Sequence, residues 1–382
     1  MKALKLIASS RRYLSPAIIF ATLNIVFGTW AIYIPRITKN LNVSEGELGF
    51  AVLFIALGTL SMLPFIPRLI NKYGVGKMTA VGVFAFCISF IAPFAVSGYM
   101  GLCVALFCVG ACGGMLDVSM NTLVTEIEKK DGVHFMSAAH GFFSLGGMVG
   151  AGIGTFLMPV MPNALTHIII ISVIMIVVNY FLIKNYITII APVQEQESVF
   201  KLKNIRPLIG LGIIGVLIMA SEGAIVDWSA LYLEKVTLAA ASLFGLGYTV
   251  FNAAMAFGRF YGDGISAKYG SKVILVTGAS LAAVGFALVL TADIWTAIAG
   301  FGLVGLGFSV MVPELLRYSG NLPGVAAAEG VSFISGTGFT GMLLGPVFLG
   351  FLAETFSLKS SFIALLCFAV LAGLIALSLK RK

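Results

Sequence analysis

Residues Gly110 to Asn121 read GACGGMLDVSMN, an apolar, glycine-rich stretch with a carboxylate near its centre. An aspartate in the hydrocarbon core of a bilayer costs roughly 2.5–3.5 kcal/mol on insertion scales, so we expect Asp117 to face a polar interior and not lipid. Asn121 follows four residues later and falls on the same face of a helix. The glycines would let a second helix approach closely. The stretch therefore predicts a polar site held between packed membrane helices.

The composition of the whole chain indicates a membrane protein. Of its 382 residues, 59% are hydrophobic and only 10% are charged, and the mean hydropathy is +1.04; soluble domains of this length do not have such values. The net charge of +8 would suggest nucleic-acid binding in a soluble protein. Here the basic residues stand in short breaks between apolar runs, so we expect no nucleic-acid partner. No ATP motif, nucleophile triad or metal-ligand cluster occurs, so we expect no enzyme, cofactor or metal.

Apolar runs of about 20 residues recur between short polar breaks, and each run of this length predicts a transmembrane helix. We place twelve of them at about 13–35, 47–67, 78–97, 99–123, 135–158, 164–184, 207–233, 243–265, 273–291, 294–317, 329–353 and 360–379. The sequence thus predicts an all-α integral membrane protein with two six-helix bundles. The bundles would span residues 1–184 and 207–382, and residues 185–206 would form the linker between them.

Basic residues are spread unevenly over the two sides that this topology creates. Twenty of the 24 lie on the side of the termini and the linker, and the other side has Arg36, Lys39, Lys235 and Lys359. Because loops rich in lysine and arginine stay in the cytoplasm, we expect both termini and the linker on the cytoplasmic side of the inner membrane.

The two halves of the chain repeat one another. Residues 72–77 read KYGVGK and residues 268–272 read KYGSK, an offset of 196 from Lys72 to Lys268. Such a duplication predicts two similar bundles that face each other across a cavity, with a binding site near the membrane midplane. Other pairs at nearly this spacing are Trp30 with Trp228, Gly49 with Gly245, and Gly147 with Gly341.

The loop after the second predicted helix, Pro67-x-x-x-Asn71-Lys72-x-Gly74-x-x-Lys77, resembles the signature of the major facilitator superfamily. A second, similar element runs from Gly258-Arg259 through Gly262-Asp263 to the KYGSK loop. The resemblance covers the whole chain and implies a secondary transporter that works by alternating access. It also implies a gating role, through charge and helix-dipole contacts, for Asn71, Lys72, Arg259 and Asp263.

Three segments, residues 117–121, 136–150 and 222–232, resemble the MosC-like (YbjJ-like) branch of that superfamily. The acid and the asparagine of the first segment are also spaced as in the fucose permease group, where the acid is implicated in proton coupling. That similarity implies that Asp117 takes up and releases protons. Fucose permease-like proteins carry another acid near the end of helix 1, but residues 28–35 contain none. Asp117 would therefore work alone or with Glu222 or Asp227.

Glu222 and Asp227 lie in the apolar run 208–233. Five residues place them about 140° apart around a helix, so they cannot both point at one spot. We expect at least one to serve the solute or the coupling ion, while the other makes a bond between helices. A structural role at a bend near Gly223 is the alternative.

The remaining candidates suit a hydroxylated, sugar-like solute, because amides bond hydroxyl groups and aromatic rings cover C–H faces. They are Asn24, Trp30, Tyr33, Asn121, His140, Trp228, Tyr248 and Asn252. Two alternatives stay open: Trp30 and Trp228 also suit an aromatic belt at the membrane surface, and His140 also suits plain packing.

Together these features predict a monomeric secondary transporter of a small polar solute, sugar-like or cyclitol-like, linked to protons. Export of a metabolite or an amphipathic drug is a second interpretation. A membrane sensor that binds its ligand without moving it is a third.

Overall fold

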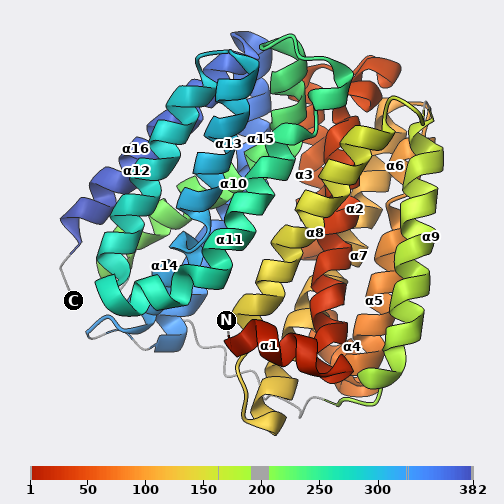
Figure 1. The fold of residues 1–382 in the computed structure, drawn as a ribbon, viewed down its shortest axis with the longest axis vertical. Coiled ribbons are helices and arrows are strands. Elements are labelled where there is room, and N and C mark those ends of the chain that lie inside the picture. Colours follow the sequence, from red (N-terminus) through yellow and green to blue (C-terminus); the bar gives the residue numbers. More distant parts are fainter. Residues whose placement is uncertain (1, 162, 191–205, 324, 326, 380–382) are drawn as a thin grey trace. The chain divides into compact units, whose positions relative to one another are not determined.

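The structure is a computed structural model that describes residues 2–161, 163–190, 206–323, 325 and 327–379. Within these ranges the regular secondary structure is helical throughout. The chain divides into two compact units, Met1–Gln194 and Glu195–Lys382, whose elements are coloured along the sequence in Figure 1. Most of the expected linker, from residue 191 to residue 205, lies outside the described residues.

The first unit contains α1 (Lys2–Ser9), α2 (Arg11–Leu41), α3 (Glu45–Met62), α4 (Ile66–Tyr73), α5 (Val75–Ser89), α6 (Ala92–Ala95), α7 (Tyr99–Asp131), α8 (Met136–Leu157), α9 (Ala164–Leu182) and η1 (Ile183–Asn185). The second contains η3 (Arg206–Leu208), α10 (Ile209–Lys235), η4 (Ala241–Leu243), α11 (Leu246–Tyr269), α12 (Ser271–Val289), α13 (Ile294–Phe308), α14 (Met311–Gly320), α15 (Ala327–Thr355) and α16 (Leu358–Ser378).

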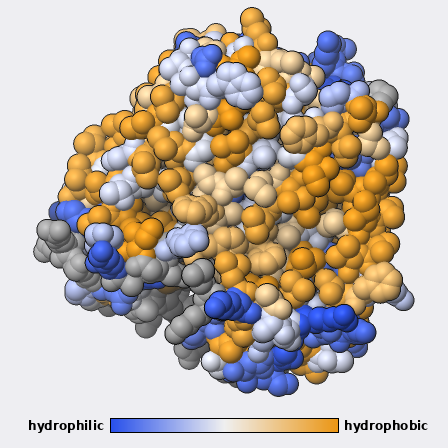
Figure 2. Space-filling view, viewed as in Figure 1, coloured by the Kyte–Doolittle hydropathy of each residue, from blue (hydrophilic) through white to orange (hydrophobic). Residues whose placement is uncertain are grey.

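The described residues contain 11 helical segments that are long and apolar enough to cross a membrane. They coincide with eleven of the twelve predicted spans. The remaining predicted span coincides with α8, which has 22 residues, six of them glycines that contribute little hydropathy. The prediction of an all-α membrane fold is therefore confirmed. On α9, the side chains of Val173, Ile174, Val177, Tyr180 and Phe181 are exposed, and the flank formed by α9 is largely hydrophobic in Figure 2, as a lipid-facing surface should be.

Three predicted spans are interrupted by short breaks. The second divides into α3 and α4, the third into α5 and α6, and the tenth into α13 and α14. In each case the second piece carries a proline among its first three residues, namely Pro67, Pro93 and Pro313. Proline is tolerated in the first turn of a helix, where its missing N–H is not needed, but it breaks a helix interior. These prolines therefore mark new helix starts.

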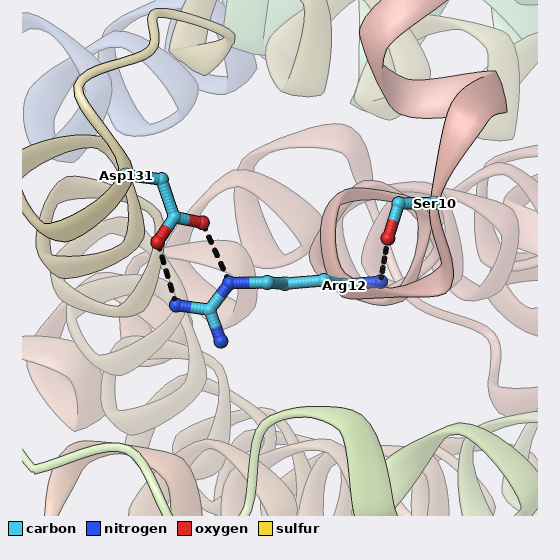
Figure 3. A network of polar contacts seen from close by, with 3 residues as sticks. All are labelled: Ser10, Arg12 and Asp131. Carbon is cyan, nitrogen blue, oxygen red and sulfur yellow. Dashed lines mark hydrogen bonds and ion pairs between the residues drawn. The ribbon is translucent and has the colours of Figure 1, made fainter.

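The helix α7 continues about two turns past its predicted end and stops at Asp131. Its 33 residues span about 50 Å, more than the hydrocarbon core requires. The extension holds two other helices. The Glu128 carboxylate accepts hydrogen bonds from the backbone N–H groups of Phe135 and Met136, at the start of α8. Asp131 accepts two from Arg12, at the start of α2, with Nε–Oδ2 2.6 Å and Nη2–Oδ1 3.0 Å (Figure 3).

We expect a coupling energy of about 1 kcal/mol between Arg12 and Asp131, because the pair is bidentate but partly exposed, with side-chain exposures of 33% and 19%. A double-mutant cycle of Arg12→Gln and Asp131→Asn, followed by thermal unfolding in detergent, measures it. Strictly additive effects of the two substitutions would contradict this value.

Glycine-mediated helix crossings occur in the same register in both units. A Cβ added at Gly146 on α8 would collide with the carbonyl oxygen of Ala21 on α2, and one added at Gly341 on α15 would collide with that of Val216 on α10. Both members of the pair differ by 195 residues. The crossings of α3 with α7 and of α11 with α13 also repeat, through Gly110–Ile55 and Gly305–Phe251, where the glycines differ by 195 residues and their partners by 196.

This register changes two of the pairs expected from the sequence. Gly341 matches Gly146, one residue before its predicted partner. Because α2 and α10 are unbroken, Trp228 matches Tyr33, one turn beyond its predicted partner Trp30. The two KYG loops do match. Their glycines, at 74 and 270, have φ angles of +89° and +78°, a region that favours glycine, and the lysine ammonium lies 5.1 Å from the neighbouring tyrosine ring in both.

Candidate functional site

Asp117 and Asn121 lie on α7 along the face that packs against α3. Higher on this face, Gly110 accepts a hydrogen bond from the Thr59 hydroxyl at 3.0 Å, and Gly114 contacts the same residue. Asp117 follows on this face and is exposed. The Asn121 amide donates to the Asp117 backbone oxygen at 2.8 Å and to its Oδ1 at 3.2 Å. The amide thus orients a carboxylate that remains accessible.

Glu222 on α10 forms an ion pair with Arg259 on α11, with Oε2 and Nη2 4.0 Å apart. Side-chain exposures of 16% and 19% show that both groups are largely enclosed. The sequence resemblance implied that Arg259 belongs to the gating element near the KYGSK loop. The structure places it within the apolar part of α11, where it compensates the charge of Glu222. An arginine inside an apolar run is itself a signal that an acid lies near it.

Replacing Arg259 with Gln is expected to lower the free energy of unfolding by about 1–3 kcal/mol, because Glu222 would lose its counter-charge in an enclosed position. The double variant Glu222→Gln/Arg259→Gln should recover most of that loss. Chemical unfolding in detergent measures both. A double variant less stable than Arg259→Gln alone would contradict the pairing.

Asp227 lies on a different face of α10 from Glu222. Val216 and Ala220, which meet α15 at Gly341 and Gly345, fall on the same helical stripe as Asp227. Asp227 is 6% exposed, and no hydrogen bond or ion pair joins it to another described residue. The two acids therefore differ in surroundings, as their spacing predicted. Glu222 is paired with Arg259 of α11, and Asp227 is enclosed on the stripe of α10 that meets α15 about two to three turns earlier.

The tryptophans predicted for the site are buried, Trp30 at 0% and Trp228 at 1% exposure. The aromatic-belt interpretation is therefore wrong for both, because a belt residue contacts the membrane surface. Trp30 packs edge-on against Phe90, which caps the end of α5, and against Phe94 of α6. Trp30 and Trp228 are therefore interior residues, Trp30 of the first unit and Trp228 of the second.

Tyr33 is also buried, and its hydroxyl lies 3.1 Å from Nδ1 of His167 on α9. His167 was not among the residues predicted from the sequence, because a single histidine in an apolar run gives no spacing signal. A recess of about 390 Å³ lies near this pair and is lined by Arg36, Ile37, Asn40, Phe94, Asn163, Ala164 and Leu165. None of the predicted solute residues lines this recess.

The other predicted polar residues make contacts within one unit. The Asn24 amide donates to the Phe143 carbonyl at 3.0 Å and so joins α2 to α8. His140 packs edge-on against Phe20, with ring centroids 4.9 Å apart. Tyr248 and Asn252 are buried on one face of α11, where the asparagine amide donates to the tyrosine carbonyl at 3.0 Å.

Of the four residues implied to act in gating, Asn71 and Lys72 are exposed at the end of α4. Arg259 pairs with Glu222, as described above. The side chain of Asp263 lies outside the described part of the structure. The sequence placed Asn71 and Lys72 in a loop, but both lie in the last turn of the helix α4, and the loop proper begins only at Gly74.

Comparison with known proteins agrees with this architecture. The family model for the Major Facilitator Superfamily matches residues 16–241 and 211–382. An uncharacterized MFS-type transporter of Yersinia pestis is 31% identical over 347 residues, 90% of each chain. The membrane protein MosC of Rhizobium meliloti is 26% identical over 350 residues, 91% of this chain and 85% of MosC.

Two solved structures share the fold. The nucleoside transporter NupG has a TM-score of 0.73 at 12% identity, covering 97% of this chain and 100% of NupG. A bacterial homolog of the human lysosomal transporter Spinster has a TM-score of 0.71 at 14% identity and 95% coverage of both chains. With a family match over nearly its whole length and the helical architecture described above, the chain belongs to the major facilitator superfamily of multi-pass membrane transporters.

Proposed function

We propose that this chain is a proton-linked secondary transporter that moves a small polar solute, sugar-like or cyclitol-like, by alternating access. The observation that supports this most is Asp117, an exposed carboxylate within an apolar span and oriented by Asn121. An ionisable residue inside a membrane span is costly and commonly marks a solute or proton pathway. Asp117 is the primary proton-accepting group in this proposal, and Glu222 and Asp227 are the secondary ones.

Asn121 suits both protonation states of its neighbour. Its NH₂ group can donate to the ionised carboxylate, and its carbonyl oxygen can accept from the protonated one. The protonation state of Asp117 therefore decides which group of the Asn121 amide is left to hydrogen-bond a hydroxylated solute. On α11, Tyr248 and Asn252 are the polar residues that we propose to contact the solute. The other proposed solute-binding residues are Asn24, Trp30, Tyr33, His140 and Trp228.

The orientation in the membrane is part of the proposal. With Arg259 inside α11, nineteen basic residues remain on the side of the termini against four on the other side. This asymmetry supports cytoplasmic termini in the inner membrane. We propose that the monomer is the working unit, since each chain carries both six-helix halves.

Uptake into proteoliposomes tests the function. Labelled sugars, cyclitols and nucleosides are offered with an imposed pH gradient of either sign and with no gradient. A symporter accumulates its solute only when protons flow in the same direction, and an exporter shows the opposite dependence. Binding without movement under every gradient would favour the membrane sensor and reject the transporter.

A further inference from the structure

Asp227 is an enclosed carboxylate without a counter-charge. It is 6% exposed on α10, and none of the described residues forms a hydrogen bond or ion pair with it. Arg259 is already paired with Glu222, about 140° away around the helix. Enclosing an unpaired charge is costly, so an enclosed carboxylate is normally paired or neutralised. Something other than these residues must therefore balance Asp227.

The space needed for a partner lies one turn away on the same face of α10. A Cβ added at Gly223 would have no atom within 4 Å. In the first unit the equivalent residue, by the 195-residue register, is Gly28. A Cβ there would lie 2.8 Å from the Gly147 carbonyl oxygen and 2.9 Å from the Ala151 nitrogen. The same helix crossing is thus closed in one unit and open in the other.

The difference coincides with a proline. By the same register Ala151 of α8 corresponds to Pro346, which lies inside α15. A proline in a helix interior removes one hydrogen bond and kinks the helix away from its regular path. The crossing before the proline is intact, since Gly341 and Gly345 contact Val216 and Ala220. In this register Pro346 takes the place opposite Gly223 that Ala151 holds opposite Gly28, and Gly223 has the open space that Gly28 lacks.

We propose that the space beside Gly223, between α10 and α15, receives an ammonium group of the transported solute, which pairs with the Asp227 carboxylate. This rests on the proposed function and narrows its solute to an amine. A primary ammonium is compact and has three donors for the carboxylate oxygens. A metal ion suits the site less well, because the described residues contain no group of three or more metal-ligating side chains.

Thermal shift of the purified, detergent-solubilised chain tests this with two matched sets of probes. The first set is glucosamine, glucose and N-acetylglucosamine, and the second is cyclohexylamine and cyclohexanol. We expect the Tm to rise by a few degrees with at least one amine and to stay unchanged with its neutral counterparts. Asp227→Asn should remove that shift. Glu354→Gln, which changes an exposed carboxylate on α15, should keep it.

In a second measurement, the ammonium group is supplied by a lysine side chain introduced by substitution. Gly223→Lys places an amine one turn before Asp227 on the same face, and Gly223→Met is its uncharged match. We expect Gly223→Lys to have the higher Tm of the two and to abolish the response to the amine probes. In the Asp227→Asn background the advantage of lysine over methionine should vanish.

The outcomes separate this inference from the proposed function. Shifts that are equal for amines and neutral probes, or an amine shift retained in Asp227→Asn, would overturn the ammonium site. The ammonium site would also be overturned if no amine raised the Tm and Gly223→Lys were no more stable than Gly223→Met. Asp227 would then be neutralised by a proton alone. Both measurements record binding and stability, so a failure of gradient-driven transport would reject the proposed function without affecting them.

Discussion

Replacement of Asp117 by asparagine is expected to lower pH-driven solute accumulation at least about tenfold while leaving counterflow exchange intact. A proton-coupled carrier needs a group whose charge changes as water access alternates, and the amide has the shape of a protonated aspartate but cannot ionise. Exchange of labelled for unlabelled solute needs no net proton movement. Since Asp117 is exposed, the substitution should leave the fold intact. Parallel accumulation and counterflow assays in proteoliposomes measure the two rates.

Asp293→Asn is the matched control. Asp293 lies outside the predicted spans and caps α13, and hydrogen bonds from the Thr296 backbone N–H and hydroxyl hold the pKa of Asp293 below its usual value. Its stabilising effect is therefore present above the unfolded-state pKa and is lost only as pH falls through the lower folded-state value. It stays ionised near neutral pH, and asparagine also caps helices well. Unimpaired accumulation by Asp117→Asn at normal abundance would contradict the coupling role.

A single methyl group at Gly110 is expected to destabilise the first unit by about 3 kcal/mol or more. The Cβ of Gly110→Ala would collide with the carbonyl oxygen of Ile55 on α3. A backbone oxygen cannot rotate away as a side chain can, so α3 and α7 would have to separate along a crossing that also includes Gly114 and Thr59. Thermal unfolding and the fraction of monodisperse protein after extraction measure the loss.

Gly223→Ala is the control for this substitution, since it is also a glycine-to-alanine change inside a transmembrane helix. No atom would lie within 4 Å of the new Cβ. Alanine is favoured over glycine in a helix interior by up to about 1 kcal/mol, so this variant should be as stable as the parent chain or more so. Equal losses of stability in Gly110→Ala and Gly223→Ala would mean that the close approach of α3 is not the reason why Gly110 is needed.

The sequence predicted the spans well because hydropathy reports directly on the length of chain in the bilayer. It located the ends less well. Hydropathy reports where the lipid stops, whereas α7 continues to Asp131 because its last turns are held by contacts with α2 and α8. The breaks at Pro67, Pro93 and Pro313 could have been predicted, since each proline stands at a place where a helix can begin but not continue.

Within the candidate site, local periodicity predicted what lies on one helix. The contact of Asn121 with Asp117 follows from a spacing of four residues, and the separation of Glu222 from Asp227 follows from a spacing of five. The pairing of Glu222 with Arg259 depends on how α10 and α11 pack, and no periodicity in either segment contains that information. Similarly, the match of Trp228 with Tyr33 needed the contact register, because aromatic residues alone gave an alignment displaced by one turn.

The crossings between glycines and carbonyl oxygens have a consequence for which residues can vary at these contacts. A carbonyl oxygen is the same atom whatever side chain its residue carries, so only the glycine side of each contact is restricted in residue type. Ala21 and Val216 occupy equivalent positions, as do Ile55 and Phe251, and in both pairs the residues differ although the opposing glycines are retained. One side of each contact is thus free to differ in residue type, and the two units keep the same crossing points although the side chains there differ.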